Sequence, residues 1–344
     1  MNIGVQCFDR KKRVQGRNYL SNIFYDCLAT ITSNVLKVQN DKPLEQYIND
    51  NKLDVVFTFE TSKNFKVVQD IKERTSCRLI EVPMIDCIKQ PYFSKGNYTV
   101  YDDILCVSQF TYDKFKEAGY DNLYLCRVGF RTIKPTIKED SNIVFFHPGG
   151  WGGSLYRKNT LGTIRAFNAA SKYRSDISLI FTSQWTKDQF LGYYPKEEAE
   201  EALYDIDNND RIISHFGSLE RYEFLRLYDQ SDVLIYTSLK EGVGLCVYEA
   251  MRRGIPAIIT NAPPLNEVVT KENGWLCHSS VKPAPKGSKL CVDLYYPDNI
   301  ILTRIIANMQ KEEVLKASKN AINTIDTICP WNNFQKQLQE LLNM

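Results

Sequence analysis

Two glutamates, Glu241 and Glu249, bracket a short segment that contains two glycines. An apolar run at 232–238 leads into this segment, and another apolar run at 254–260 follows it. Glycine lets the backbone approach a ligand closely, and free N–H groups at the start of a helix attract phosphate. The pattern therefore predicts a strand-to-helix turn that holds a diphosphate, with a sugar at one end and a ribose at the other. The alternative is that both acids only complement a helix dipole.

A second glycine-rich loop begins at Gly149 and Gly150, directly after the apolar run Ile143–His147, and it leads to Arg157 and Lys158. Glycines free backbone amides, and a cation beside them can neutralise the charge of a departing phosphate. The alternative is a solvated Arg-Lys pair at the start of a helix, where cations oppose the helix dipole. That mismatch favours the phosphate-binding role, so both cations are candidate catalytic residues.

The composition is that of an ordinary soluble protein, with 43% hydrophobic and 24% charged residues among 344. A formal net charge of +2 is too small to indicate nucleic-acid binding. Ten cysteines without a C-x-x-C pair indicate reduced thiols in a cytoplasmic protein. We find no signal peptide and no apolar stretch long enough to cross a bilayer, so we expect any membrane contact to be peripheral.

Metal ligands are scarce in the sequence. The three histidines, His147, His215 and His278, are isolated from one another. The acids of Asp205-Ile-Asp207 are expected in a polar connection that is open to solvent. We therefore expect no metal site and no other cofactor, and a bound nucleotide would be a substrate.

Short apolar strands alternate with amphipathic helices along the chain, which predicts an α/β fold with parallel sheets covered on both faces. The polar, proline-containing segment 134–142 is a candidate linker between an N-terminal domain (1–133) and a C-terminal domain (143–330). A last amphipathic segment, 331–344, is expected to cross back to the first domain. Residues 158–172 are expected to form one helix.

The segment from Glu241 to Glu249, with Gly254 and Pro256 after it, resembles the signature of family 4 retaining glycosyltransferases. The resemblance covers nearly the whole chain and is specific from about Gly217 to Gly274. It implies the glycosyltransferase-B (GT-B) fold, in which two doubly wound Rossmann-like domains face each other across a cleft. Ligands would lie beyond the carboxyl ends of the strands.

The resemblance also implies roles for single residues of the C-terminal domain. Glu249 would bind the ribose, and Glu241 would contact the donor sugar and stabilise its developing positive charge. Lys158 matches the lysine of the family, but Trp151 follows Gly150 where the family has arginine, so Arg157 would supply that charge from another position. The backbone that meets the diphosphate and sugar would be that of Gly149, Gly150, Gly242, Val243, Gly244 and Leu245.

Two further segments have weaker assignments. The loop Gly217-Ser218-Leu219 either reads the nucleobase through its backbone or is a plain strand-to-helix turn with Ser218 as the helix cap. In the N-terminal half, Gly16 and Arg17 end a basic loop that either binds an anionic acceptor or membrane surface, or is simply solvated. Asp86 stands near the position of a family histidine and is a candidate for positioning the acceptor.

The function expected from the sequence is transfer of a sugar, with retention of configuration, from a UDP- or GDP-sugar to a glycan, a lipid-linked or another acceptor. The departing phosphate would take the acceptor's proton, as the resemblance implies. Two alternatives stay open. One is a GT-B nucleotide-sugar epimerase, and the other is a degenerate module that binds a sugar nucleotide without catalysis.

Overall fold

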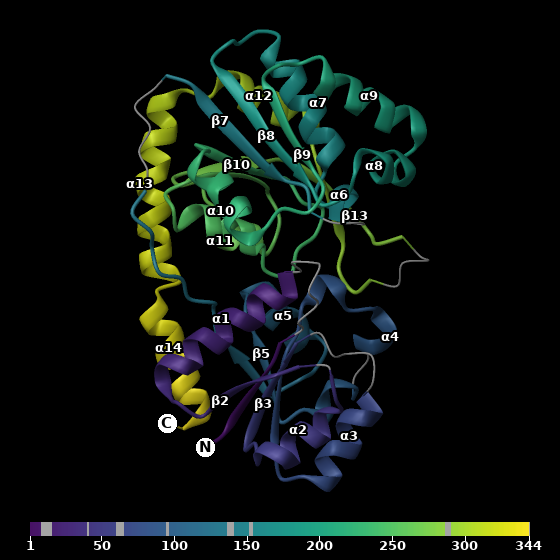
Figure 1. Ribbon diagram of the computed structural model, residues 1–344, viewed down its shortest axis with the longest axis vertical. Coiled ribbons are helices and arrows are strands. Elements are labelled where there is room, and N and C mark those ends of the chain that lie inside the picture. Colours follow the sequence, from purple (N-terminus) through teal and green to yellow (C-terminus); the bar gives the residue numbers. More distant parts are fainter. Residues whose placement is uncertain are drawn as a thin grey trace. The chain divides into compact units, whose positions relative to one another are not determined.

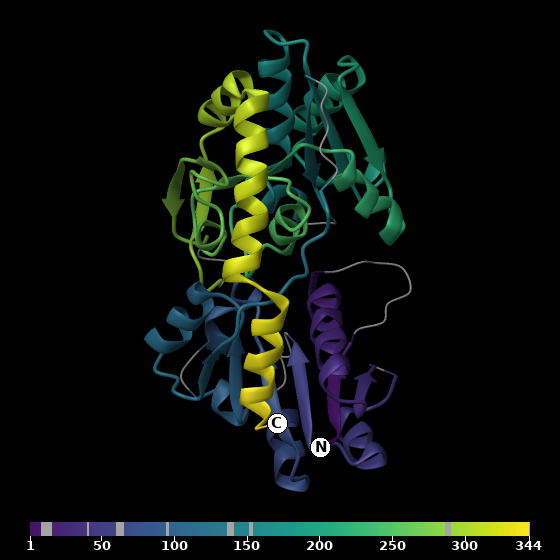
Figure 2. The same ribbon diagram turned by 90° about the vertical axis from the view of Figure 1, so that its left-hand side faces the viewer.

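The computed structural model describes residues 1–7, 16–39, 41–59, 65–93, 96–135, 141–150, 154–285 and 290–343. Their internal contacts divide the chain into two compact units (Figures 1 and 2). Unit 1 consists of Met1–Gly129, Ala284–Val292 and Cys329–Met344, and unit 2 consists of Phe130–Pro283 and Asp293–Ile328. Residues 284–292, which the sequence analysis placed in the C-terminal domain, therefore group with unit 1.

Within the described ranges, unit 1 contains a six-stranded parallel sheet with the strand order β2-β1-β3-β4-β5-β6. The strands are β1 (Ile3–Gln6), β2 (Val35–Val38), β3 (Val55–Phe59), β4 (Arg78–Val82), β5 (Asp103–Cys106) and β6 (Leu123–Leu125). The helices are α1 (Gly16–Ile31), α2 (Leu44–Asn51), α3 (Phe65–Arg74), α4 (Gln90–Phe93), α5 (Gln109–Glu117) and α14 (Trp331–Leu342), with short 3-10 turns η1 (Ile85–Cys87) and η2 (Tyr98–Val100). The central strands are buried on both faces, as expected for a parallel sheet.

The C-terminal helix α14 is part of the core of unit 1. Phe334 packs edge-on against Phe24 of α1, with ring centroids 5.0 Å apart. A side chain at Gly129 would collide there, because its Cβ would lie 2.5 Å from the Cβ of Phe334. Arg78 donates to the carbonyl oxygen of Leu341 at 2.8 Å, near the end of the helix. These contacts attach the end of the chain to the same sheet as its beginning.

Unit 2 contains a second six-stranded parallel sheet, again counted over the described part of the chain, with the order β12-β11-β10-β7-β8-β9. Its strands are β7 (Ile143–Pro148), β8 (Ile177–Ser183), β9 (Ile212–Phe216), β10 (Val233–Tyr236), β11 (Ala257–Thr260) and β12 (Gly274–Cys277), and a separate antiparallel pair is formed by β13 (Ser279–Lys282) and β14 (Leu294–Pro297). The helices are α6 (Ser154–Arg157), α7 (Thr160–Ser171), α8 (Lys187–Tyr193), α9 (Lys196–Asp207), α10 (Arg221–Asp229), α11 (Leu245–Met251), α12 (Asn299–Asn308) and α13 (Lys311–Ile328), with η3 (Leu265–Glu267) after β11.

Helices cover both faces of this sheet. Successive residues of a strand point to opposite faces. Phe145 of β7 packs against Phe167 of α7, whereas the next residue, Phe146, packs against Phe224 and Tyr228 of α10. The two Rossmann-like α/β units with parallel sheets, expected from the alternating pattern and from the family resemblance, are therefore present.

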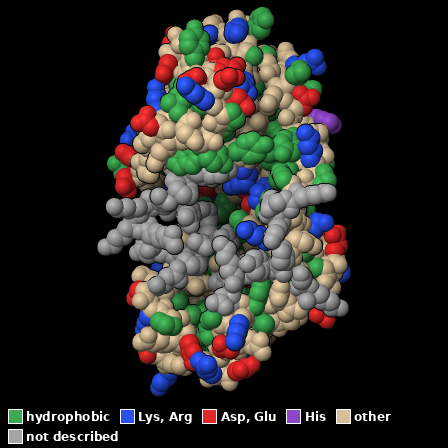
Figure 3. Space-filling model, turned by 90° about the vertical axis from the view of Figure 1, so that its right-hand side faces the viewer, with side chains coloured by type: hydrophobic (Ala, Val, Ile, Leu, Met, Phe, Trp, Pro, Cys, Tyr) green, Lys and Arg blue, Asp and Glu red, His purple; other side chains and the backbone are tan. Residues whose placement is uncertain are grey.

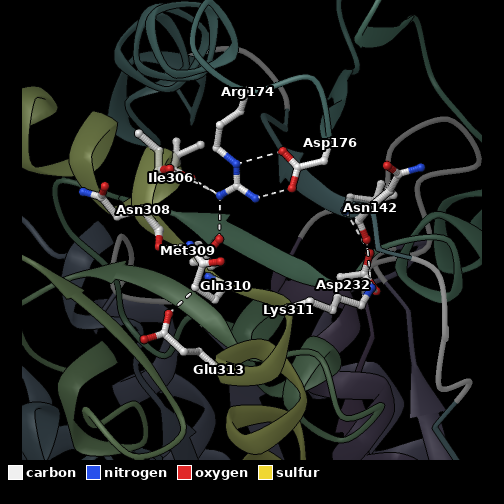
Figure 4. Close-up of polar contacts among 12 residues, drawn as sticks. Asn142, Arg174, Asp176, Asp232, Ile306, Asn308, Met309, Gln310, Lys311 and Glu313 are labelled. Atoms are coloured by element: carbon white, nitrogen blue, oxygen red, sulfur yellow. Dashed lines mark hydrogen bonds and ion pairs between the residues drawn. The ribbon is translucent and has the colours of Figure 1, made fainter.

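Two partly buried cations connect the C-terminal helices of unit 2 to the amino ends of its strands (Figure 4). Arg174 pairs with Asp176 through two nitrogens and also donates to the carbonyl oxygen of Met309, at the end of α12. Lys311, at the start of α13, donates to the carbonyl oxygen of Asn142 at 2.8 Å and to Asp232 at 3.1 Å. The loops that carry the candidate site residues follow the opposite, carboxyl ends of the strands.

We predict that replacing Arg174 by methionine lowers the free energy of unfolding by roughly 2–3 kcal/mol, because charge-assisted hydrogen bonds to partly buried carbonyls are lost. The matched control is Arg165→Met on α7, whose ion pairs with Glu198 and Glu201 lie at the surface. That variant should change stability by less than about 1 kcal/mol. Urea unfolding measures both. Equal losses for the two variants would contradict the assigned role of Arg174.

Candidate functional site

The residues singled out in the C-terminal half gather at the carboxyl edge of the sheet of unit 2. Gly149 and Gly150 follow β7, Gly217 follows β9, and the segment 241–245 follows β10. In parallel α/β sheets this edge is where ligands bind. The topology thus brings together loops that are far apart in the sequence.

Glu241 lies at the centre of this edge, and only 7% of it is exposed. Its Oε1 accepts a hydrogen bond from the hydroxyl of Tyr236 at 2.8 Å and another from Arg157. Burial opposes ionisation of this carboxyl, but Arg157, Lys158 and the Tyr236 hydroxyl hold its pKa below the ordinary value. Glu241 is therefore a carboxylate at neutral pH.

Tyr236, the last residue of β10, joins Glu241 to Lys158. The Nζ atom of Lys158 donates to the Tyr236 hydroxyl at 2.9 Å and lies 4.2 Å from the centre of its ring. Burial and the charge of Glu241 raise the pKa of Tyr236 well above its ordinary value, so its hydroxyl keeps its proton and donates to the carboxylate. Lys158, Tyr236 and Glu241 form a buried hydrogen-bonded chain, which we call the Lys158–Glu241 chain.

The sequence analysis expected Lys158 to begin a helix, but it does not. It lies in the turn between α6 and α7, where Asn159 adopts a left-handed conformation with φ of 56°. Asn159 is held there by hydrogen bonds to Thr237 at 3.2 Å and to Asn299 at 3.0 Å. Gly162 leaves the necessary space, because a Cβ at that position would lie 2.3 Å from Oδ1 of Asn159. This break in the helix directs Lys158 to the end of β10.

Arg157 connects the same turn to the loop after β10. Its side chain donates to Glu241 and, at 2.9 Å, to the carbonyl oxygen of Lys240. Its own carbonyl oxygen accepts from the N–H of Leu239 at 2.7 Å and from the Ser238 hydroxyl at 3.2 Å. The guanidinium therefore lies beside Glu241, although Arg157 does not stand at the position of the family arginine.

The backbone after Glu241 is tightly packed. Gly242, Val243, Gly244 and Leu245 are all buried. Gly244 caps α11 with φ of 79°, a conformation that favours glycine, and a Cβ there would lie 2.4 Å from Cδ2 of Leu265. This glycine is therefore required by both its conformation and its surroundings.

Glu249 lies on α11 and is 3% exposed. Its carboxylate accepts hydrogen bonds from Arg221 at 3.2 Å and from Arg253. Nε of Arg252 lies 3.5 Å from the same carboxylate. The sequence analysis predicted a ribose-binding acid here but did not anticipate the arginines, which lie on α10 and at the end of α11.

The loop after β9 has unoccupied space beside its glycine. Gly217 has φ of 99°, and a Cβ added there would meet no atom within 4 Å. Ser218 is exposed and Leu219 is partly buried. Ser218 does not cap the following helix. Glu220 is the cap, because its side chain and that of Glu223 bond reciprocally to backbone N–H groups.

Aromatic side chains that the sequence analysis did not select lie near these loops. The carbonyl oxygen of Trp185 accepts from the N–H of Gly217 at 2.9 Å, and its ring centre lies 4.5 Å from that of Tyr193. Tyr156 on α6 is 53% exposed. Figure 3, which faces the side where Figure 1 places α6, α8 and β13, shows a band of hydrophobic side chains in its upper half. Such surfaces suit stacking with planar rings.

The candidate metal ligands are engaged elsewhere. Both ring nitrogens of His147 contact protein oxygens, from Ile235 and Thr160, and burial lowers its pKa to about 4. Asp205 and Asp207 lie in the last turn of α9, not in a polar connection as expected. Among the described residues, no group of three or more His, Cys, Asp or Glu residues could hold a metal ion.

The acceptor-side candidates belong to unit 1. Gly16 and Arg17 begin α1, but the side chain of Arg17 and the rest of the basic loop, 9–15, lie outside the described residues, as does Trp151. Asp86 lies in η1, just after β4, and is 5% exposed. None of the described helices is both long and apolar enough to span a bilayer.

Residues 152–285 match the family model described as glycosyl transferases group 1. This match covers less than half of the chain but includes Lys158, Glu241 and Glu249. A search of curated proteins finds no match. The sequence similarity therefore concerns the part of the chain that carries the candidate site of unit 2.

Solved structures resemble the whole chain or most of it. Anabaena HepE in complex with UDP and glucose has a TM-score of 0.69 at 16% identity, over 100% of this chain and 99% of HepE. Sucrose-phosphate synthase from Thermosynechococcus elongatus has a TM-score of 0.68 at 13% identity, over 100% and 98%. A Staphylococcus aureus TarM variant in complex with fondaparinux, α-GlcNAc-glycerol and UDP has a TM-score of 0.67 at 10% identity, over 87% of this chain and 58% of TarM. At these identities the likeness shows the fold, which is that of the GT-B glycosyltransferases.

Proposed function

We propose that this protein is a retaining glycosyltransferase that moves a sugar from a nucleotide-diphosphate-sugar to a glycan, a lipid-linked or another acceptor. The observation that carries the proposal is the Lys158–Glu241 chain, joined by Arg157, at the carboxyl edge of a parallel sheet. This network lies in the segment that matches the glycosyl transferases group 1 model. HepE and TarM were solved with UDP, which supports UDP-sugars as the first donors to test, before GDP-sugars.

The network supplies the charges that such a reaction needs. A departing nucleoside diphosphate gains negative charge as the glycosidic bond breaks, and the cations Lys158 and Arg157 would stabilise it. The sugar ring develops positive charge, which the ionised Glu241 would stabilise from nearby. We propose that the departing phosphate takes the acceptor's proton and that no metal ion is needed.

The remaining candidates complete the donor and acceptor sides. Glu249 would bind the ribose, and the backbone at Gly217–Leu219 would face the nucleobase. We assign the acceptor to unit 1, where Asp86 and the start of α1 would contribute. We propose that the enzyme acts in the cytoplasm, and that a lipid-linked acceptor would bring it to a membrane only peripherally.

One experiment distinguishes this proposal from its alternatives. The protein is incubated with UDP- and GDP-sugars, with and without an acceptor panel, and the products are identified by nuclear magnetic resonance. Acceptor-dependent release of the nucleoside diphosphate, with the anomeric configuration kept, supports the proposal. An isomerised sugar nucleotide without acceptor would indicate an epimerase. Donor binding without turnover on any acceptor would indicate a binding module.

We predict that Lys158→Met lowers kcat by roughly a hundredfold, the scale seen when one charge-stabilising donor is removed from an active site. The matched control is Lys196→Met on α9, where the lysine pairs with Glu200 at the surface. Steady-state kinetics with the active donor measures both variants. A kcat for Lys158→Met equal to that of the control would show that another group stabilises the leaving phosphate.

We predict that Tyr236→Phe lowers kcat by about tenfold, because one hydrogen bond to each charged neighbour is lost. The donor KM should change less, since the hydroxyl positions Lys158 and Glu241 and is not assigned a donor contact. Tyr204→Phe on α9 removes an exposed hydroxyl and serves as the control. If kcat of Tyr236→Phe matches that of Tyr204→Phe, the Lys158–Glu241 chain has no part in turnover.

A further inference from the structure

Three arginines surround the carboxylate of Glu249. Arg221 donates to Oε1 at 3.2 Å, Arg253 donates to Oε2, and Nε of Arg252 lies 3.5 Å from Oε2. The Glu249 side chain is 4% exposed, so its charge requires these partners. The three arginines do not hold the carboxylate in the same way.

Arg253 is fixed in the protein. It is 8% exposed and also donates to the backbone carbonyl of Glu249 at 2.9 Å. Its guanidinium lies 5.4 Å from the centre of the Tyr228 ring, and its Nε lies 3.4 Å from Asp229. Both Arg253 and Arg252 belong to the chain turn that follows Glu249, so they balance its charge locally.

Arg221 reaches Glu249 from a different element. It is the first residue of α10, a few residues after Gly217, where a side chain would meet open space. Its own side chain is 36% exposed, whereas that of Glu249 is 4% exposed. Arg221 therefore extends from the loop proposed to face the nucleobase to the carboxylate proposed to bind the ribose.

The hydroxyls of a ribose diol need both a hydrogen-bond acceptor and a hydrogen-bond donor as partners. Each hydroxyl donates one hydrogen bond and also accepts, whereas a carboxylate only accepts and a guanidinium only donates. A carboxylate has about four lone-pair sites. Within the described residues, the Glu249 carboxylate accepts two hydrogen bonds, one from Arg221 and one from Arg253. Glu249 can thus accept from a hydroxyl without releasing its arginines.

We propose that Arg221 is a specificity-determining residue that reads the ribose of the donor together with Glu249. The carboxylate accepts from the diol, and the guanidinium donates to an oxygen of the same diol. This inference rests on the proposed function. The pair selects ribonucleotides, because a deoxynucleotide lacks a hydroxyl that donates to the carboxylate and accepts from the guanidinium.

The test is calorimetric binding of UDP, 2′-deoxy-UDP and 3′-deoxy-UDP, or of the GDP series if GDP binds more tightly. The wild type should prefer the ribonucleotide over at least one deoxy form by about tenfold or more, the scale of one hydrogen bond to a charged group. In Arg221→Met this preference should fall at least about fivefold. The control, Arg226→Met, removes an exposed arginine from the same helix and should keep the preference.

An unchanged preference in Arg221→Met, with UDP still bound, would overturn the inference and leave Arg221 as a charge-balancing residue. Thermal unfolding shows whether that variant folds. If it does not fold, Arg221→Gln, which removes the charge but keeps a polar head, is judged by the same two outcomes. A wild type that binds no nucleoside diphosphate would overturn the proposed function and this inference with it, whereas a wild type that binds UDP tightly without preference would overturn the inference alone.

Discussion

The site depends on one buried carboxylate and the groups that keep it charged. Glu241 is ionised inside the protein because Arg157 and the Tyr236 hydroxyl bond to it and Lys158 lies behind that hydroxyl. An isolated charge in this position would be costly. The same cations that balance Glu241 in the free protein are those that a diphosphate would engage, so the arrangement is prepared for an anionic ligand.

The backbone features around this network serve its geometry. The left-handed Asn159 lies in the turn between α6 and α7, directly before α7, and this turn directs Lys158 toward β10. Gly162 leaves space for that turn. The carbonyl oxygen of Arg157 accepts from Leu239, which holds the turn against the loop after β10. At the opposite edge of the sheet, Arg174 and Lys311 anchor α12 and α13 to the amino ends of the strands. The carboxyl edge is thereby free of these structural attachments.

The fold could be predicted from the sequence because alternating apolar strands and helices indicate parallel sheets without knowledge of any long-range contact. The turn from Glu241 to Glu249 could be predicted for the same reason, since strand, glycines and acids are adjacent in sequence. The proposed roles of Tyr236 and Arg221 could not be predicted, because they come from contacts to residues that are distant in the sequence. Helix α8 was not predicted, although the sequence carries a local signal for it, the Thr186 and Gln189 pair that forms a reciprocal cap. Glu220 and Glu223 form a similar cap at α10, but glutamate is not among the residue types preferred at a cap position.

The central claim is that the Lys158–Glu241 chain, with Arg157, forms a diphosphate site. The most direct measurement is calorimetric binding of a nucleoside, its monophosphate and its diphosphate, in the uridine and guanosine series, to the wild type and to Lys158→Met. The account predicts that the wild type binds the diphosphate at least about tenfold more tightly than the nucleoside, and that Lys158→Met loses most of this difference. Equal affinity of the wild type for nucleoside and diphosphate would contradict it.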